Sequence, residues 1–232
     1  MPTLSTEARR LAKANAQAAI DAASEALADG LIDRTAWHER VTCALAAAYL
    51  ADDDPRWQSG FDGDATAWRE ARELILEAVS GDGTFLDVGC ATGHLMECLA
   101  AWGLERGQHL AMYGLELNAD LARAARRRLP AGADRIHVGN AVDWEPPMRF
   151  TYVRTGLEYV PAPRQTLLAA RLLRDVVEPG GRLIIGPVPA ADLANVLAVL
   201  DAAGRASPAV VQATDRGGKT RCVAYVERER TA

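Results

Sequence analysis

Lysine is nearly absent from this chain, because Lys13 and Lys219 are the only two among its 232 residues. Arginine supplies the remaining positive charge, yet acidic residues outnumber basic ones and the formal net charge at pH 7 is −5. A domain that grips nucleic acid by bulk charge is usually basic. The composition therefore argues against that class of protein, although it leaves room for a local basic patch.

Cysteine is also scarce, and the chain lacks long apolar runs. Its four cysteines, Cys43, Cys90, Cys98 and Cys222, form no C-x-x-C pair and match no zinc-binding spacing. No apolar run reaches the roughly 18–20 residues that a membrane helix needs, and the first residues do not resemble a signal peptide. We therefore expect free thiols, no metal site, no membrane span and a cytoplasmic protein.

Helical patterns fill the first third of the chain. Residues 5–28 are rich in alanine, have apolar side chains at helical spacing, and are followed by Gly30, a typical stop. Asp33 and Asp64 are suitable N-caps for a second and a third helix. The turn formers at 80–83 end this region. The expected domains are an N-terminal helical region over 1–80 and a second domain over 81–232.

Short apolar runs alternate with amphipathic stretches from residue 84 onward, which is typical of a parallel sheet with helices on both faces. The expected strands are 84–88, 110–115, 135–138, 150–154 and 182–186. The helices expected in this region are 94–102, 120–129, 164–177 and 192–202. The runs 208–213 and 221–227 flank Arg216-Gly217-Gly218 and predict an antiparallel hairpin. The predicted fold class is α/β: a Rossmann-like, doubly wound, mostly parallel sheet with a terminal antiparallel hairpin strand.

The segment from Phe85 to His94, F-L-D-V-G-C-A-T-G-H, leads from a strand through a glycine-containing turn into a helix. Gly89 and Gly93 permit close approach of a ligand, and the helix N-terminus favours an anionic group. Glu116 ends the next strand, where an acid accepts hydrogen bonds from ribose hydroxyls. The spacing is not the G-x-G-x-x-G of nicotinamide and flavin sites. Asp87 disfavours a pyrophosphate and suits a ligand that carries an ammonium group.

These residues resemble the first two motifs of the class I S-adenosylmethionine-dependent methyltransferases. Val138-Gly139-Asn140-Ala141 resembles the family segment that lines the adenine, although the family often has Asp at the position of Asn140. Residues 150–154 resemble the fourth strand, and 177–183 resemble the P-G-G turn before the fifth. The resemblance covers about 84–229. It implies S-adenosyl-L-methionine as cofactor and S-adenosyl-L-homocysteine as product.

The resemblance also implies which residues surround the cofactor. They are Asp87, Gly89, Cys90, Ala91, Gly93, His94, Glu116, Leu117, Asn140, Ala141, Arg154 and Thr155. Cys90 is best interpreted as a small space-filler, because no partner base is identifiable nearby. Asn140 is open to a second interpretation as a turn former, and Arg154 is suited to pair with an acid near the cofactor.

Methyl transfer from a sulfonium is a direct displacement, so the protein mainly aligns the acceptor and excludes water. In the resembling family the residues just after the fourth strand front the methyl group. Glu158 is therefore the candidate base or the group that binds a cationic acceptor, and Tyr159 is the candidate that positions the acceptor. A solvated loop carboxylate and ordinary packing are the respective alternatives.

The resemblance further implies that the N-terminal helices form a lid over the cofactor and the acceptor. Trp57, Trp68 and Arg72 are the lid residues expected at the substrate, together with Arg56. An arginine there is suited to bind the methionine carboxylate of the cofactor, whereas a core or surface role is the alternative for each residue.

The most favoured function at this stage is a bacterial methyltransferase that acts on an O or N atom of a small metabolite. An RNA or protein methyltransferase and a non-catalytic protein that has kept the fold are the alternatives. The second of these would have a degraded first motif, which Asp87, Gly89 and Gly93 argue against. We expect a small-molecule partner and no membrane partner. A homodimer is left open.

Overall fold

The computed structural model describes residues 4–157, 160–204 and 207–230. Its centre is a seven-stranded sheet in the order β3-β2-β1-β4-β5-β7-β6. The strands are β1 (Gly83–Val88), β2 (Leu110–Glu116), β3 (Ile136–Val138), β4 (Phe150–Thr155), β5 (Val177–Pro189), β6 (Ala209–Thr214) and β7 (Thr220–Glu227). The first five are parallel, and β7 is antiparallel to both β5 and β6. This arrangement confirms the predicted fold class.

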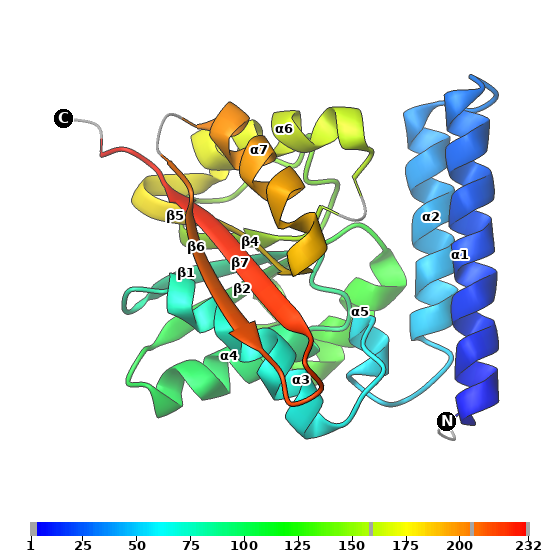
Figure 1. The fold of residues 1–232 in the computed structure, drawn as a ribbon, viewed down its shortest axis with the longest axis horizontal. Helices are drawn as coiled ribbons and strands as arrows, with labels where there is room; N and C mark the ends of the chain where they lie inside the picture. Colours follow the sequence, from blue (N-terminus) through cyan, green and yellow to red (C-terminus); the bar gives the residue numbers. More distant parts are fainter. Residues whose placement is uncertain (1–3, 158–159, 205–206, 231–232) are drawn as a thin grey trace.

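Two antiparallel N-terminal helices stand beside the α/β body (Figure 1). They are α1 (Thr6–Ala28) and α2 (Arg34–Tyr49). Ser5 and Asp33 cap them, each accepting a backbone N–H with its side chain. Their shared apolar cluster is built from Ala23, Trp37 and Val41 with partly buried neighbours. This cluster is separate from the apolar clusters of the α/β body, so α1 and α2 have a small apolar core of their own.

The remaining helices cover the two faces of the sheet. They are η1 (Trp57–Ser59), α3 (Ala65–Arg72), η2 (Glu73–Ala78), α4 (His94–Glu105), α5 (Ala119–Arg128), η3 (Pro130–Arg135), α6 (Ala162–Arg171), η4 (Leu172–Val176), η5 (Ala190–Asp192) and α7 (Leu193–Ala203). One core cluster joins α6 and α7 to one sheet face. Another joins α3, η2 and α4 to the other face, and a third lies under α5. The result is a three-layer α/β/α body.

The structure differs from the sequence expectation in three local places. The third helix ends at Arg72 and continues as the tighter η2, whose residues pack against Phe85, Tyr152 and Val223 of the sheet. The helix after β4 ends in the π-turn η4. Strand β5 begins at Val177 rather than at 182, because Val177 pairs with Phe150 across an irregular step that contains Gly180. None of these differences changes the order of the elements.

Within the residue ranges that the structure describes, no helix is long and apolar enough to cross a bilayer. The same residues contain no cluster of three or more His, Cys, Asp or Glu side chains that would hold a metal ion.

A buried carboxylate ties the start of α1 to the loop that leads from α2 into the body. Asp52 is fully buried and accepts hydrogen bonds from Leu4 N–H at 2.8 Å, Arg9 Nε at 2.9 Å and Asp54 N–H at 2.8 Å. Arg9 also lies over the Trp57 ring. Burial alone would raise the pKa of Asp52, but these hydrogen bonds outweigh it and lower the pKa. The N-terminal helices are therefore fixed to the body at one end.

We expect Asp52→Ala to lower the free energy of unfolding by about 3 kcal/mol, because Arg9 then keeps a largely buried charge without its main partner. Asp62→Ala is the matched control. Asp62 also faces Arg9, at 3.6 Å, but its side chain is 46% exposed, so the loss should stay below about 1 kcal/mol. Urea unfolding measures both losses, and equal losses would contradict the assignment.

The contribution of Asp52 should also depend on pH. Because the folded pKa is lower than the unfolded one, the stabilisation is complete above the ordinary carboxyl pKa of about 4 and is lost as the pH falls through the folded value. The difference between wild type and Asp52→Ala should therefore shrink in acid.

Candidate functional site

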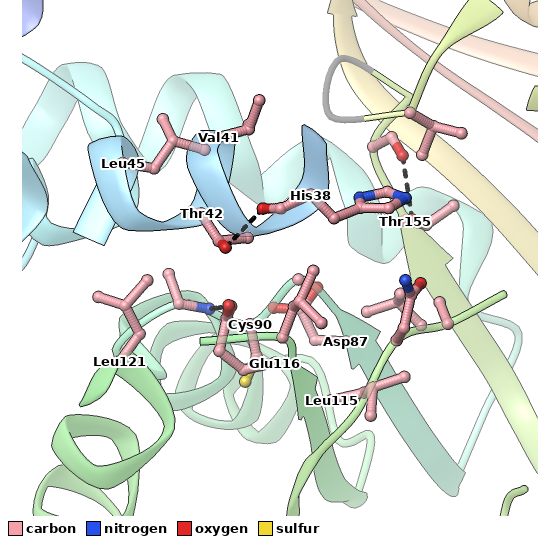
Figure 2. Close-up of a pocket in the computed structure, with 18 of the residues that line it drawn as sticks. His38, Val41, Thr42, Leu45, Asp87, Cys90, Leu115, Glu116, Leu121 and Thr155 are labelled. Atoms are coloured by element: carbon pink, nitrogen blue, oxygen red, sulfur yellow. Dashed lines mark hydrogen bonds between the residues drawn. The ribbon is translucent and has the colours of Figure 1, made fainter. Parts of the chain in front are cut away.

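A pocket of about 690 Å³ lies at the carboxyl ends of β1, β2 and β4, beneath α2. Figure 2 shows side chains of α2 on one side of it and the strand ends on the other. In this sheet the chain order reverses on either side of β1, since β2 and β4 are its two neighbours. A crevice at such a switch point is the usual ligand site of an open α/β sheet. The volume suits a small organic ligand.

The turn between β1 and α4 forms the floor of the pocket. Gly89 has φ +80°, and a Cβ on it would meet nothing within 4 Å, so the missing side chain opens toward the pocket that it lines. Gly93 has φ +78° but packs on α5, where a Cβ would lie 3.3 Å from Ala125 Cβ. Between them, Ala91 has φ +48°, a conformation that glycine adopts more easily. Only Gly89 of the two glycines therefore gives a ligand room.

Glu116, at the end of β2, is held by backbone donors on both of its carboxylate oxygens. Oε2 accepts from Ala91 N–H at 2.8 Å and Oε1 accepts from Asn118 N–H at 2.9 Å. Burial raises the pKa of Glu116, and the hydrogen bonds from Asn118, Ala91 and Leu117 oppose that rise. The two carboxylate oxygens offer about four acceptor positions in all, so these three donors leave acceptor capacity for a hydrogen bond from the pocket.

Asp87, at the end of β1, forms an ion pair with Arg154 of β4. Arg154 Nη1 lies 3.1 Å from Asp87 Oδ1, and its Nε donates to the carbonyl of Gly186 at 2.7 Å. The Asp87 residue is only 1% exposed. Burial raises its pKa, while Arg154 and, less strongly, Arg72 lower it. The prediction that Arg154 pairs with an acid near the cofactor is in agreement with this geometry.

Arg72 and Trp68 bring the end of α3 into the same pocket. The Arg72 guanidinium lies 5.1 Å from the Trp68 ring centroid and 5.5 Å from that of Phe61. Both Arg72 and Trp68 line the pocket, and so do Asp87 and Arg154. Two arginines and one aspartate thus share this end of the pocket.

Cys90 packs into the turn as the sequence suggested. A Cβ at Gly114 would lie 2.7 Å from Cys90 Sγ, so the thiol fills the space above that glycine of β2. Burial and the nearby Glu116 and Asp87 carboxylates raise the pKa of the Cys90 thiol well above its usual value. Because the thiolate is the nucleophilic form, the raised pKa disfavours a role of Cys90 as a nucleophile.

The loop after β3 contributes Asn140 and Ala141 to the pocket lining. Asn140 Oδ1 accepts from Val142 N–H at 3.1 Å, so the side chain acts as a turn former. Arg171 of α6 donates to the carbonyls of Ala141 and Trp144 and holds this helix-free loop in place. The amide nitrogen of Asn140 is a hydrogen-bond donor, so this pocket-lining residue can also donate to a ligand.

The connection from β4 to α6 forms another wall of the pocket. Thr155 is buried and lines it, as do Gly156, Val160 and Pro161. Gln165 donates to the carbonyls of Leu157 and Val160 and fixes both ends of the intervening segment. The candidate catalytic residues Glu158 and Tyr159 lie outside the described residues, so their roles stay predictions.

Some predicted site residues do not line the pocket, and each has another role. His94 stacks on Trp68 with ring centroids 5.1 Å apart and faces Glu97 and Cys98, behind the pocket wall. Trp57 is buried, and its indole N–H donates to the carbonyl of Ala48 at 2.7 Å. Gly93 packs on α5, as described above. The other predicted cofactor residues, together with Trp68 and Arg72, do line the pocket.

Sequence reasoning expected the N-terminal helices to form a lid but missed the α2 residues that line the pocket. They include Val41 and Leu45, which also belong to the cluster with α1: Arg34, Thr35, His38, Glu39, Val41, Thr42, Leu45 and Tyr49. Asp143 and Arg164 were missed as well. Polar side chains spaced by four, as at Arg34, His38 and Thr42, were the available signal, but a solvated helix face shows the same pattern.

We expect Gly93→Ala to destabilise the protein by about 2 kcal/mol, because it combines a strained left-handed backbone with close contacts to α5. Gly89→Ala should lower the free energy of unfolding by about half as much, since it strains the backbone but creates no close contact. Chemical denaturation of the ligand-free variants measures both. A larger loss for Gly89→Ala would contradict the different roles assigned to the two glycines.

Comparison with known proteins gives partial sequence matches and broad structural ones. No protein-family model matches the chain. Two trans-aconitate 2-methyltransferases of Rhodopseudomonas palustris, from strains HaA2 and BisB5, are each 35% identical over 80 residues, which is 34% of this chain and 29% of the relative. The matched segment is thus well under half the length of these curated relatives.

Among solved structures, the chain resembles SAM-bound CalS10, an amino pentose methyltransferase from Micromonospora echinaspora, with a TM-score of 0.53 and 18% identity over 75% of this chain and 95% of that one. It also resembles the [4+2]-cyclase SpnF, with a TM-score of 0.51 and 16% identity over 69% of this chain and 81% of that one. At such identities the likeness establishes the fold alone. The fold of this chain is that of the class I S-adenosylmethionine-dependent methyltransferases, the family that its motifs resemble.

Proposed function

We propose that the chain binds S-adenosylmethionine and transfers its methyl group to an O or N atom of a small molecule. The observation that carries this proposal is the set of groups at the ends of β1 and β2. Gly89 leaves open space, Glu116 is fixed with free acceptor positions, and Asp87 lies among arginines, all in one pocket. The 35% identity of an 80-residue segment to trans-aconitate 2-methyltransferases supports the same reaction type.

The nucleoside part of the cofactor fits the β2 side of the pocket. The remaining acceptor capacity of Glu116 suits a ribose hydroxyl, which is a donor. Leu117, Asn140 and Ala141 line the adjacent wall, where an adenine ring would find apolar contact and an amide. The structurally similar CalS10 is SAM-bound, which supports S-adenosylmethionine as the ligand.

The amino-acid part of the cofactor fits the β1 and β4 side. An α-ammonium group suits the carboxylate of Asp87, and an α-carboxylate suits the guanidinium of Arg72 or Arg154. Because these three side chains already neutralise one another in part, a zwitterion can bind without leaving a buried charge unpaired.

When bound, S-adenosylmethionine supplies an activated methyl group on a sulfonium. The chain itself then has to align the acceptor and exclude water. The α2 residues Val41 and Leu45 and the strand residues Val88 and Leu115 give the pocket apolar walls from both sides. These walls favour water exclusion around the reacting atoms.

We propose that α1 and α2 act as the lid and that α3 and η2 belong to the α/β body. The expected division at residue 80 is refined in this way because α3 and η2 pack on the sheet, whereas α1 and α2 share a separate cluster. A lid over the pocket favours a small acceptor over a folded protein or an RNA stem. The acidic net charge of −5 points in the same direction. A bacterial cytoplasmic enzyme is compatible with this composition.

The fold alone does not fix the reaction, as the similarity to a [4+2]-cyclase illustrates. A protein that binds S-adenosylmethionine but turns over no metabolite would support the non-catalytic alternative. Salt-sensitive RNA binding would support the macromolecular one. Size-exclusion chromatography with light scattering decides whether the chain forms the homodimer left open above.

Calorimetric titration with S-adenosylmethionine and S-adenosylhomocysteine tests the cofactor proposal. We expect Asp87→Asn and Glu116→Gln each to weaken binding by at least tenfold, because each loses a charge-assisted hydrogen bond. Asp120→Asn is the control, since Asp120 is 60% exposed on α5 and pairs with Arg123. Absence of binding to the wild-type chain would refute the proposal. Circular dichroism checks that the variants are folded.

Glu158 and Tyr159 stay candidates for the acceptor site. We expect Glu158→Ala and Tyr159→Ala to lower turnover while S-adenosylmethionine affinity is unchanged. Loss of cofactor affinity in either variant would assign that residue to the structure of the cofactor site instead. Turnover is measured as S-adenosylhomocysteine release in the presence of a panel of small alcohols, phenols, amines and carboxylic acids.

A further inference from the structure

Helix α2 presents one histidine to the pocket. Figure 2 shows the His38 ring projecting from α2 toward the end of β4, with Thr42 and Leu45 farther along the helix above the ends of β1 and β2. His38 is half-buried, and its ring meets Trp37 edge-on at 4.9 Å. The backbone carbonyl of His38 accepts from Thr42 Oγ1. The ring is therefore placed by a regular helical turn and not by a loop.

The position of the reacting atom follows from the proposed function, on which this inference rests. If Glu116 holds the ribose and Asp87 the ammonium group, the sulfonium between them lies over the end of β1. The turn that contains Gly89, Cys90 and Ala91 closes the pocket below that point. An acceptor must then approach from the side of α2 and β4. His38 and Thr155 are polar residues on that side.

The charges around His38 come from several elements. Burial lowers the pKa of His38 most, Arg34 one turn earlier on α2 lowers it further, and Asp143 of the β3–β4 loop raises it. Glu39 of α2, Arg164 of α6 and the Arg72–Asp87–Arg154 group line the same pocket. The lowered pKa keeps the imidazole neutral at pH 7, which is the form that accepts a proton.

The other described groups in the pocket are less suited to take a proton. Asp87 is paired with Arg154, and Glu116 is held by two backbone N–H groups. The Cys90 thiol is protonated, because its pKa is raised. Glu39 and Asp143 are exposed at the rim, where water solvates their charge. His38 is thus the described side chain that combines a neutral base with a place facing the strand ends.

We propose that His38 is the general base of the transfer and that the acceptor is a neutral hydroxyl or amine that still carries the proton it loses. In this step a lone pair of the acceptor O or N forms the bond to the methyl carbon. The C–S bond breaks, and its electron pair stays on sulfur, which becomes a neutral thioether. The acceptor proton passes to the free ring nitrogen of His38. An acceptor that is already an anion, such as a carboxylate, would not need this base.

The first experiment is an NMR titration of the His38 ring in the full chain, alone and with S-adenosylmethionine or S-adenosylhomocysteine. The two ligands differ by the methyl group and the positive charge on sulfur. A nearby positive charge disfavours imidazolium, so the pKa of His38 should be lower with S-adenosylmethionine than with S-adenosylhomocysteine. His38→Gln assigns the resonance. His109, exposed before the opposite end of β2, is the internal control whose curve should be the same with both ligands.

The possible results distinguish a failure of this inference from a failure of the proposed function. If neither ligand binds, the proposed function fails. If both bind and the His38 curves coincide, His38 does not lie beside the sulfonium and the inference is overturned. Asp143→Asn should lower the pKa of His38 in the free protein, because it removes the group that raises it.

A second measurement tests the chemistry with the alcohols, phenols and amines of the panel that are methylated. We expect His38→Gln to lower kcat about 100-fold, with S-adenosylmethionine affinity unchanged, and to abolish the fall in rate at acidic pH that protonation of His38 causes in the wild type. A wild-type rate and pH profile in this variant would overturn the proposal.

Discussion

The carboxylate of Glu116 is the contact on which the rest of the site depends. By accepting from Ala91 N–H and Asn118 N–H, it joins the turn after β1 to the start of the helix after β2. The left-handed conformation of Ala91 aims its N–H at that carboxylate. The two strand ends are thereby held in one geometry, and Gly89 keeps its open side toward the pocket. Backbone N–H groups thus fix the geometry of the strand ends, and the other side chains of the site act within that geometry.

Charge is balanced differently at the two ends of the pocket. At the β2 end, a single carboxylate is satisfied by neutral backbone donors. At the β1 and β4 end, Asp87 is set against Arg154 and Arg72. Burial of Asp87 without such partners would be costly. The asymmetry matches a ligand with a neutral diol at one end and a zwitterion at the other.

The succession of strands and helices and the turn after β1 could be predicted because they depend on local patterns: apolar runs, glycines and an acid at a strand end. Pocket residues on α2 could not, since no local pattern tells which face of an amphipathic helix meets another domain element. His94 shows that contacts with residues distant in the sequence can also turn a motif residue away from the pocket. It follows Gly93 directly in the motif, yet stacking on Trp68 turns it away from the pocket. Trp57 was expected at the substrate, but its N–H is taken by the Ala48 carbonyl.

Helix α2 serves the helix pair and the pocket with overlapping sets of residues. Trp37, Val41 and Leu45 pack with Ala23 of α1. Val41 and Leu45 also line the pocket, together with Arg34, His38 and Thr42, which lie outside that cluster. Arg34, His38 and Thr42 can therefore be exchanged without loss of the apolar packing that holds α1 and α2 together, whereas a change at Val41 or Leu45 would alter that packing and the pocket at once.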